Sequence, residues 1–299
     1  MQLKLGTQFV EPEGRYLTLD LLDSSDAVNE PAVLRRRLEE DGYLLIRGFH
    51  DPDAVLAARR DILETLAEQG KLDPQAPLMD GVVNPNTTPD TISVRGREAL
   101  KTQSLKSVVR APRTMQFFDR FFGEASVSFN FQWLRTAGPG AASPVHCDMV
   151  YMGRGTKELC TLWTPFGRVT PDMGSLAICL GSHRWQEIID TYGQDDVDHN
   201  VTPGIFTHDP AELVDRFGGR WATTTFEPGD AIIVSMHLLH ASLGNLTNRY
   251  RISCDTRYQR ASQPQDERWS GEAPQGHPVM WSPGVQLETV EVSRKRWGI

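Results

Sequence analysis

Two stretches that lie far apart in the sequence most constrain how this chain can fold. Residues 145–149 carry His146 and Asp148 on either side of Cys147, and His240 follows much later. We interpret the first stretch as a strand in which His146 and Asp148 project to one side and Cys147 to the other. Bringing His240 next to them requires remote strands to converge, which predicts a core of packed strands.

A long apolar run leads to the second stretch. Residues 229–240 begin with a Gly-Asp turn and continue as a predicted buried strand, in which Met236 and Leu238 share a face with His240. His237 falls on the opposite face of this strand. His240 is therefore the ligand candidate, and His237 is interpreted as a surface or packing residue.

These residue types indicate a metal site. Two imidazoles and one carboxylate can occupy one face of an octahedral metal ion and leave three positions open, which is the ligand set of mononuclear non-haem Fe(II) oxygenases. One carboxylate leaves Fe(II) with a net charge of about +1, which favours an anionic co-substrate. A His-x-Asp pair also arises by chance in many chains, so the pair alone leaves a purely structural role open.

A candidate anchor for such a co-substrate lies beyond His240. Residues 249–255 alternate polar and apolar side chains, as a strand does, and contain Arg251. An antiparallel neighbour returning from a hairpin would bring Arg251 beside the metal candidates. Its planar guanidinium could hold a carboxylate there by two parallel hydrogen bonds. Asp255 and Arg257 share its strand face, where they either recognise a polar substrate or pair with each other.

The order and spacing of several motifs resemble the phytanoyl-CoA dioxygenase family of Fe(II)/2-oxoglutarate oxygenases; these motifs are His146-x-Asp148, Gly181-Ser182-His183, His240-x-Ser242, Arg251 and residues 41–49. The resemblance covers about residues 30 to 260 and implies a double-stranded β-helix, or jelly roll. It implies that Arg251 binds the distal carboxylate of 2-oxoglutarate, that Ser242 assists it and that Trp163 lines the same site. It places His183, a third candidate ligand, outside the metal shell.

The remaining periodicity predicts an α+β fold with a jelly-roll core and N-terminal helices packed on the outside of the sheet. Helical spacing of apolar residues predicts helices at residues 31–42, 52–70 and 115–122. Short strands are predicted at residues 43–49, 127–133, 159–164 and 176–180. Gln132, on the polar face of one of these strands, either contacts the co-substrate or is a solvent-facing or structural amide.

We predict one catalytic domain rather than two small ones; its parts are a helical region at about 1–123, a jelly-roll core at about 124–260 and a tail at 261–299. Two polar segments interrupt this pattern. Residues 71–105 form either a lid over the metal site or a plain surface loop. Residues 185–225 are expected to wall the substrate pocket, and their Asp/His cluster at 194–199 is interpreted as a solvated insertion rather than a second metal site.

The composition excludes some classes of binding partner. With 299 residues, 39% hydrophobic residues and a net charge of −8, the chain is predicted to be a soluble globular protein. The acidic balance argues against nucleic acid or anionic membrane as the main partner, and the basic runs at 35–37 and 294–296 are interpreted as solvated faces. Four cysteines without CxxC spacing predict a reduced, cytoplasmic protein. No apolar run approaches the ~18 residues of a membrane span.

The leading hypothesis is an oxygenase that uses Fe(II), 2-oxoglutarate and O2 to oxidise an unactivated carbon of a small molecule. Because Asp148 keeps the carboxylate that related halogenases lack, we expect hydroxylation, desaturation or ring formation rather than halogenation. Two alternatives remain at this point: a non-catalytic jelly-roll binding protein, and a cupin-type metalloenzyme that needs no 2-oxoglutarate.

Overall fold

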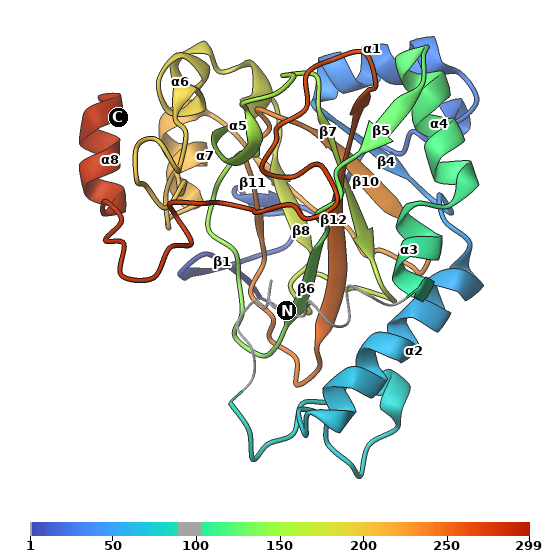
Figure 1. Cartoon of the computed structure of the whole chain (residues 1–299). Helices are drawn as coiled ribbons and strands as arrows, with labels where there is room; N and C mark the ends of the chain where they lie inside the picture. Colours follow the sequence, from blue (N-terminus) through green and yellow to red (C-terminus); the bar gives the residue numbers. More distant parts are fainter. Residues whose placement is uncertain (1, 89–102) are drawn as a thin grey trace.

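Two sheets packed face to face form the body of the molecule (Figure 1). The computed structural model describes residues 2–88 and 103–299. The larger sheet has the order β4-β10-β7-β12-β5, with β6 also paired to β12, and all of these pairs are antiparallel. Its strands are β4 (Tyr43–Ile46), β5 (Ser126–Ser128), β6 (Trp133–Ala137), β7 (Cys160–Pro165), β10 (Ala231–Ser235) and β12 (Arg251–Arg260).

The smaller sheet has the order β11-β8-β9-β3, in which only the β3–β9 pair is parallel. A separate ribbon pairs β1 with β2. The strands are β1 (Leu3–Leu5), β2 (Gln8–Val10), β3 (Leu17–Thr18), β8 (Leu176–Cys179), β9 (Trp221–Ala222) and β11 (His240–Ser242). Apolar residues of both sheets, such as Ile232 of β10 and Ile178 of β8, share one core cluster. This two-sheet arrangement confirms the predicted jelly-roll core.

The N-terminal helices cover the outer face of the larger sheet, as predicted (Figure 1). In β10, Ile233 packs with the helices, whereas Ile232 and Val234 face the inter-sheet core. This alternation follows from the two-residue period of a strand. The helices are α1 (Pro31–Asp41), α2 (Pro52–Glu68), α3 (Gln103–Val109) and α4 (Pro112–Phe122).

Local signals explain where these helices begin and end. The Asp51 carboxylate accepts a hydrogen bond from the backbone N of Asp53, and Pro52 occupies the first turn of α2. Helix α1 ends at Gly42, whose φ of +80° favours glycine, and a Cβ there would lie 2.5 Å from Nδ1 of His183. The helices predicted from these signals are confirmed.

Three strand predictions were wrong in detail. The predicted strand at 127–133 divides into β5 and β6, because Asn130 and Phe131 donate their backbone N–H groups to Trp269 O instead of to a sheet neighbour. His146 forms only an isolated bridge with His240, and Asp148 has helical dihedrals at the start of α5 (Met149–Met152). The third error concerns residues 229–240.

The run at 229–240 is not one strand. It divides into β10 and β11, which belong to different sheets and are joined by a turn at residues 236–239. The parity argument that separated His237 from His240 therefore rested on a wrong premise. The hairpin predicted to return Arg251 beside His240 is also wrong, since β12 pairs with β5, β6 and β7 while β11 pairs with β8.

The segment at 185–225 and the C-terminal tail pack together on the opposite side from α1–α4 (Figure 1). The cluster at 194–199 is not a solvated insertion, because Asp195 and Asp198 are buried and bonded to Arg296 and Arg268. The basic run at 294–296 likewise docks α8 through ion pairs of Arg294 and Arg296. The helices here are α6 (Gln186–Asp190), α7 (Ala211–Phe217) and α8 (Val290–Trp297).

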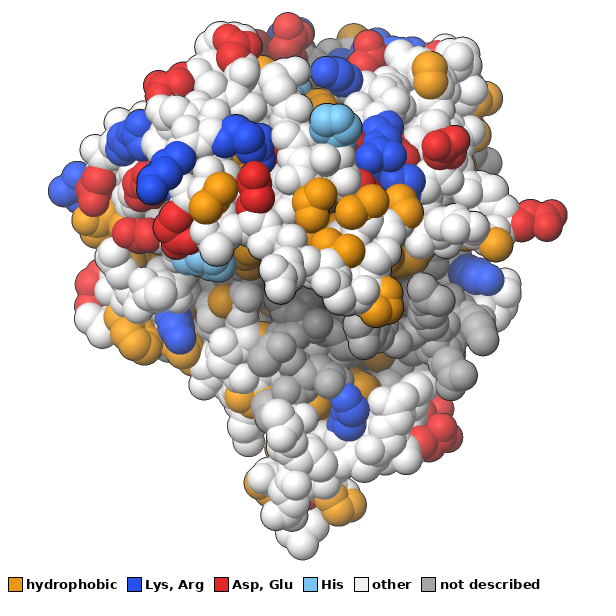
Figure 2. Space-filling view, turned by 60° about the vertical axis from the view of Figure 1, so that its left-hand side comes forward, with side chains coloured by type: hydrophobic (Ala, Val, Ile, Leu, Met, Phe, Trp, Pro, Cys, Tyr) orange, Lys and Arg blue, Asp and Glu red, His pale blue; other side chains and the backbone are white. Residues whose placement is uncertain are grey.

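Short 3-10 turns complete the described elements; they lie at Ser25–Ala27, Leu78–Asp80, Ser182–Arg184 and Tyr192–Gln194. Figure 2 shows acidic and basic side chains interspersed on the face that comes forward there. Among the described residues, no helix is long and apolar enough to cross a bilayer.

Part of the segment predicted as a lid, residues 89–102, lies outside the described residues. The division into one domain stays a prediction.

Candidate metal centre and active site

Three side chains from separate parts of the fold converge between the two sheets. His146 precedes α5, Asp148 begins it, and His240 is the first residue of β11. Their ligand atoms all lie within 4.8 Å of one another. The backbones of His146 and His240 exchange two hydrogen bonds, of 3.0 and 2.8 Å, so the two residues lie directly opposite each other. This bridge, rather than a shared strand face, brings the imidazoles together.

Backbone carbonyl groups fix the orientation of both imidazole rings. Nδ1 of His146 lies 2.9 Å from Pro144 O, and Nδ1 of His240 lies 2.9 Å from Leu238 O. Because a carbonyl oxygen only accepts, each Nδ1 carries a proton, which leaves Nε2 as the atom of each ring that can bind a metal ion. Burial, followed by the neighbouring His240, lowers the pKa of His146 to about 3. The His146 ring is therefore a neutral donor at physiological pH, as a metal ligand must be.

Asp148 is held in its charged form. Burial alone would raise its pKa, but the Arg257 guanidinium, whose Nη2 lies 3.1 Å from Oδ1, holds this pKa well below the usual range. Thr161 donates to the other carboxylate oxygen at 2.5 Å. Arg257 is itself buried and lies with its Cζ 4.0 Å from the centroid of the Trp133 ring. Two neutral imidazoles and one ionised carboxylate fit a divalent ion of borderline softness.

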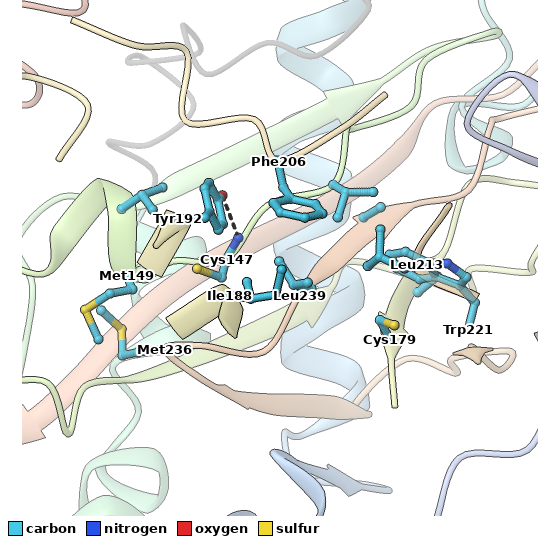
Figure 3. Close-up of a cluster of buried hydrophobic side chains, with 14 of the residues drawn as sticks. Cys147, Met149, Cys179, Ile188, Tyr192, Phe206, Leu213, Trp221, Met236 and Leu239 are labelled. Carbon is cyan, nitrogen blue, oxygen red and sulfur yellow. Dashed lines mark hydrogen bonds between the residues drawn. The ribbon is translucent and has the colours of Figure 1, made fainter. Parts of the chain in front are cut away.

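The residue between the ligands points away from the site. Cys147 packs in the hydrophobic cluster that includes Met149 and Met236, and its backbone N–H donates to the hydroxyl of Tyr192 at 3.2 Å (Figure 3). The Tyr192 hydroxyl in turn donates to Gly204 O at 2.7 Å. Residues from the 185–225 segment thus brace the His-x-Asp turn from behind.

An inner cavity opens beside the three candidate ligands. Arg251, Ser242 and Trp163 line it, as does Arg135, which sequence analysis had not singled out. The Arg251 side chain is buried; its Nη1 donates to Ser253 Oγ, and its Nε has no hydrogen-bond partner in the described part of the chain. Burial, with the Arg135 charge next, lowers the pKa of Arg251 to about 10, so it remains a cation. Among the described residues it has no carboxylate partner, and it therefore fits an anionic ligand.

The two serines of this cavity hold each other in place. Ser143 donates its backbone N–H to Ser242 Oγ, and Ser242 donates its backbone N–H to Ser143 Oγ, each at 2.7 Å. Trp163 is buried and packs edge-on against Phe226. These contacts give the cavity a rigid wall between β7 and β11.

Arg135, Asp255 and Arg257 form the charged floor of the site. Asp255 and Arg257 form an ion pair with each other, as one alternative predicted, but each also has a shorter one: Asp255 binds Arg135 Nε at 2.6 Å, and Arg257 binds Asp148. Asp255 and Arg257 are 4.0 Å apart. The alternation of side chains along the strand that carries Trp133 and Arg135 was the one sequence signal that could have revealed Arg135. Its register opposite Ser253 depends on long-range pairing.

Other candidates lie elsewhere. Gln132 is buried but does not line the inner cavity. His183 and His237 line a separate surface pocket beside Lys157, and His183 Nε2 lies 3.1 Å from Glu39 O. Among the described residues, the only cluster of three or more metal-binding side chains is His146, Asp148 and His240.

The chain matches a known protein family. The model of the family described as phytanoyl-CoA dioxygenase matches residues 38–253. The chain is 30% identical over 264 residues to the 1-deoxypentalenic acid 11-beta-hydroxylase of Streptomyces arenae, covering 81% of this chain and 86% of that protein. The enzyme of the same name from Streptomyces exfoliatus is 28% identical over 263 residues, with the same coverage.

Solved structures show the same fold at lower identity. The non-haem alpha-ketoglutarate-dependent carbocyclase SnoK from nogalamycin biosynthesis superposes with a TM-score of 0.57 at 20% identity, covering 89% of this chain and 94% of that one. The epimerase SnoN, solved with Fe3+, alpha-ketoglutarate and nogalamycin RO, gives a TM-score of 0.55 at 17% identity, covering 87% and 93%. From the family match and the curated relatives, the chain belongs to the phytanoyl-CoA dioxygenase family and is an Fe(II)- and 2-oxoglutarate-dependent oxygenase.

Proposed function

We propose that this oxygenase hydroxylates an unactivated carbon of a small organic molecule, with His146, Asp148 and His240 holding Fe(II) and Arg251 holding the far carboxylate of 2-oxoglutarate. The observation that carries the proposal is the buried Arg251 guanidinium, which lines the same cavity as the three ligands and lacks a carboxylate partner among the described residues. A buried charge without a counter-charge destabilises the fold unless a bound ligand supplies that counter-charge.

The chain's own residues would bind and orient the reactants. Arg257 and Thr161 keep the Asp148 carboxylate ionised and fixed, and the backbone carbonyls keep both Nε2 atoms free to bind metal. Ser242 and Trp163 line the proposed 2-oxoglutarate site. When bound, iron with 2-oxoglutarate supplies the oxidising chemistry; one oxygen atom of O2 enters the substrate, the other enters succinate, and CO2 leaves.

The relatives support hydroxylation over the other outcomes. Both curated proteins are named as hydroxylases of 1-deoxypentalenic acid. Asp148 supplies the third proposed protein ligand, a carboxylate, and this argues against halogenation. Ring formation, the activity named for SnoK, is the alternative outcome that product analysis would reveal.

We also infer that the protein works in the cytoplasm on a small molecule, not on nucleic acid or a membrane. All four cysteines are free and buried, which suits a reducing compartment. The net charge of −8 disfavours polyanionic partners.

The test is a calorimetric titration of 2-oxoglutarate into the anaerobic Fe(II) protein. We expect binding in the wild type and a loss of affinity of about 30-fold or more in Arg251→Gln, as for one half of a buried charged pair. Arg249→Gln is the matched control, because this neighbouring arginine is 44% exposed. With O2 present, succinate release should follow 2-oxoglutarate affinity across these variants. No binding by the wild type would refute the proposal and favour a binding protein or a 2-oxoglutarate-independent metalloenzyme.

A further inference from the structure

A second cavity continues outward from the metal centre. It shares Arg135, Ser143, His146, Asp148 and Arg257 with the inner cavity and then extends to residues of the C-terminal tail. Its volume is about 210 Å³. This is room for on the order of ten water molecules, or for the body of a small organic molecule. Because it reaches the candidate metal ligands from the side away from Arg251, it is the natural place for a substrate.

The far wall of this outer cavity is largely apolar. Trp133 lines it from β6, Met152 from α5, and Met280 and Trp281 from the tail. Aromatic rings and thioether side chains offer large, adaptable contact surfaces for a hydrocarbon skeleton. The two tail residues lie beyond residue 253, where the family match ends.

One carboxylate fixes the tail part of that wall. Oδ1 of Asp198 accepts hydrogen bonds from the backbone N–H groups of Val279 and Met280, at 3.1 and 3.0 Å. Oδ2 of Asp198 binds His277 Nδ1 at 2.9 Å and Arg268 Nη1 at 2.6 Å. Asp198 is thus a positioning residue, since it holds the segment that carries Met280 without lining the cavity itself.

Arg135 brings a positive charge to the opposite wall. Its Nε is engaged by Asp255, but within residues 2–88 and 103–299 neither Nη atom forms a hydrogen bond. The side chain is 23% exposed and lines both cavities. It therefore has two donors available in the geometry that binds a carboxylate.

The charges of the site favour an anion there even after the co-substrate has bound. The guanidiniums of Arg135, Arg251 and Arg257 face the carboxylates of Asp148 and Asp255, which leaves one positive charge in excess. Fe(II) adds two positive charges and 2-oxoglutarate removes two, so about one remains. In a site shielded from water this excess attracts a monoanion and disfavours a cation.

We propose that the outer cavity is the substrate pocket and that it takes a compact apolar molecule bearing a single carboxylate. Arg135 binds the carboxylate, while Trp133, Met280 and Trp281 contact the hydrocarbon body. The inference rests on the proposed function, because it assigns the substrate class of that same metal centre.

The first test compares matched acids and alcohols on the wild-type protein loaded with Fe(II) and 2-oxoglutarate under anaerobic conditions. The probes are 1-adamantanecarboxylate and cyclohexanecarboxylate, with 1-adamantanemethanol and cyclohexylmethanol as their neutral partners, and the readout is calorimetric affinity. We expect at least one acid to bind about tenfold tighter than its alcohol, the size of one charged hydrogen bond. If no acid of the panel is preferred, the proposal is overturned.

The second test asks whether Arg135 is the source of the preference. Arg135→Gln should bring the acid-to-alcohol ratio close to one and leave 2-oxoglutarate affinity within about threefold, whereas Arg135→Lys should retain part of the preference. Arg168→Gln is the matched control, an exposed arginine paired with Glu227. A preference that survives in Arg135→Gln, or a loss of 2-oxoglutarate binding in its place, would overturn the assignment.

Trp281→Ala tests the wall. It should weaken acid and alcohol alike by about tenfold without changing their ratio, and Val292→Ala, an exposed apolar site on α8, should change neither. Equal affinities in wild type and Trp281→Ala would show that the tail does not contact the bound molecule. Failure of this inference is distinguishable from failure of the proposed function: a wild type that binds 2-oxoglutarate but ignores the acids refutes only the substrate class.

Discussion

Two buried clusters of charge differ in how completely their groups are bonded. In the first, which we call the tail clasp, Arg268 is surrounded by Asp198, Asp266 and Tyr151 O, and each of its three side-chain nitrogens donates at least one hydrogen bond. His277 completes the clasp through Asp198. In the second, which consists of Arg251 and the charged floor of the active site, Nε of Arg251 and both Nε and Nη1 of Arg257 have no hydrogen-bond partner among the described residues.

The difference separates a structural cluster from a ligand site. A buried donor without an acceptor lowers the stability of the fold by about 1–3 kcal/mol, or by more if the donor is charged. We therefore expect a fold to retain such donors only where they serve another role, such as ligand binding. In the clasp each side-chain nitrogen of Arg268 has a partner, and the cluster holds residues 277–281 against the body. In the active site the unpaired donors belong to residues that line the same cavity as the candidate metal ligands, and a bound ligand can supply the missing acceptors.

The largest expected effect tests whether the active-site cluster depends on metal. His146→Ala removes one of the three proposed protein ligands, so succinate release should fall by at least about 100-fold, beyond the cost typical of losing an outer-shell partner. His237→Ala is the matched control, since this histidine lies on the same connection as His240 but lines a different pocket. Metal content and succinate release are measured together. Comparable losses in the two variants would contradict the ligand assignment.

The next effect tests the clasp. Arg268→Met leaves the buried carboxylates of Asp198 and Asp266 without their cation, which should lower the free energy of unfolding by about 3–5 kcal/mol in urea titrations. Arg168→Met is the control, because Arg168 binds Glu227 with a side chain that is 65% exposed and lies outside the clasp. Such an ion pair contributes at most about 1 kcal/mol. Equal effects of both variants would mean that the clasp is not a structural unit.

A smaller effect concerns an unpaired polar atom that does not mark a ligand site. His50 is buried, its Nδ1 has no hydrogen-bond partner among the described residues, and it lines neither cavity of the active site. Burial, with the Arg113 charge next, lowers its pKa from 6.5 to about 3. Above pH 6.5 neither the folded nor the unfolded chain protonates His50, so it adds no pH dependence there. Below that value only the unfolded chain binds the proton, and stability falls by about 1.4 kcal/mol per pH unit.

His50→Gln should therefore flatten the dependence of unfolding free energy on pH between about 6 and 4, by up to that amount per unit. The measurement is a series of urea titrations at fixed pH values for both proteins. An unchanged slope would show that His50 protonates in the folded state. The useful criterion for a ligand site is thus a spare donor that also carries charge and borders a cavity.

Sequence reasoning found the groups whose chemistry is local and missed those that depend on long-range pairing. His146, Asp148, His240 and Arg251 were recognisable from residue type and order. The backbone conformation at 146–148 was not, because a bridge to a remote residue and the start of a helix fix it in place of the predicted strand.

The same limit explains the remaining errors. Arg135 joins the site only because β6 pairs with β12 in one register. Asp198 was interpreted as part of a solvated insertion, since its partners Arg268 and His277 follow some seventy or more positions later and nothing near it in the sequence indicates a counter-ion. The α+β fold class was predictable because strand and helix periodicities are local, whereas the assignment of strands to sheets was not.

The smallest expected effect is the sharpest test of the comparison. Arg251→Met removes a buried charge that lacks an acidic partner among the described residues, and methionine retains much of the apolar contact. The free energy of unfolding of the ligand-free protein should therefore change by no more than about 1 kcal/mol, or increase. Adding Fe(II) and 2-oxoglutarate at 100 times the wild-type Kd should stabilise the wild type by about 2.7 kcal/mol, and the variant by much less. A loss of 3 kcal/mol without ligand, as expected for Arg268→Met, would mean that Arg251 is bonded as completely as the clasp.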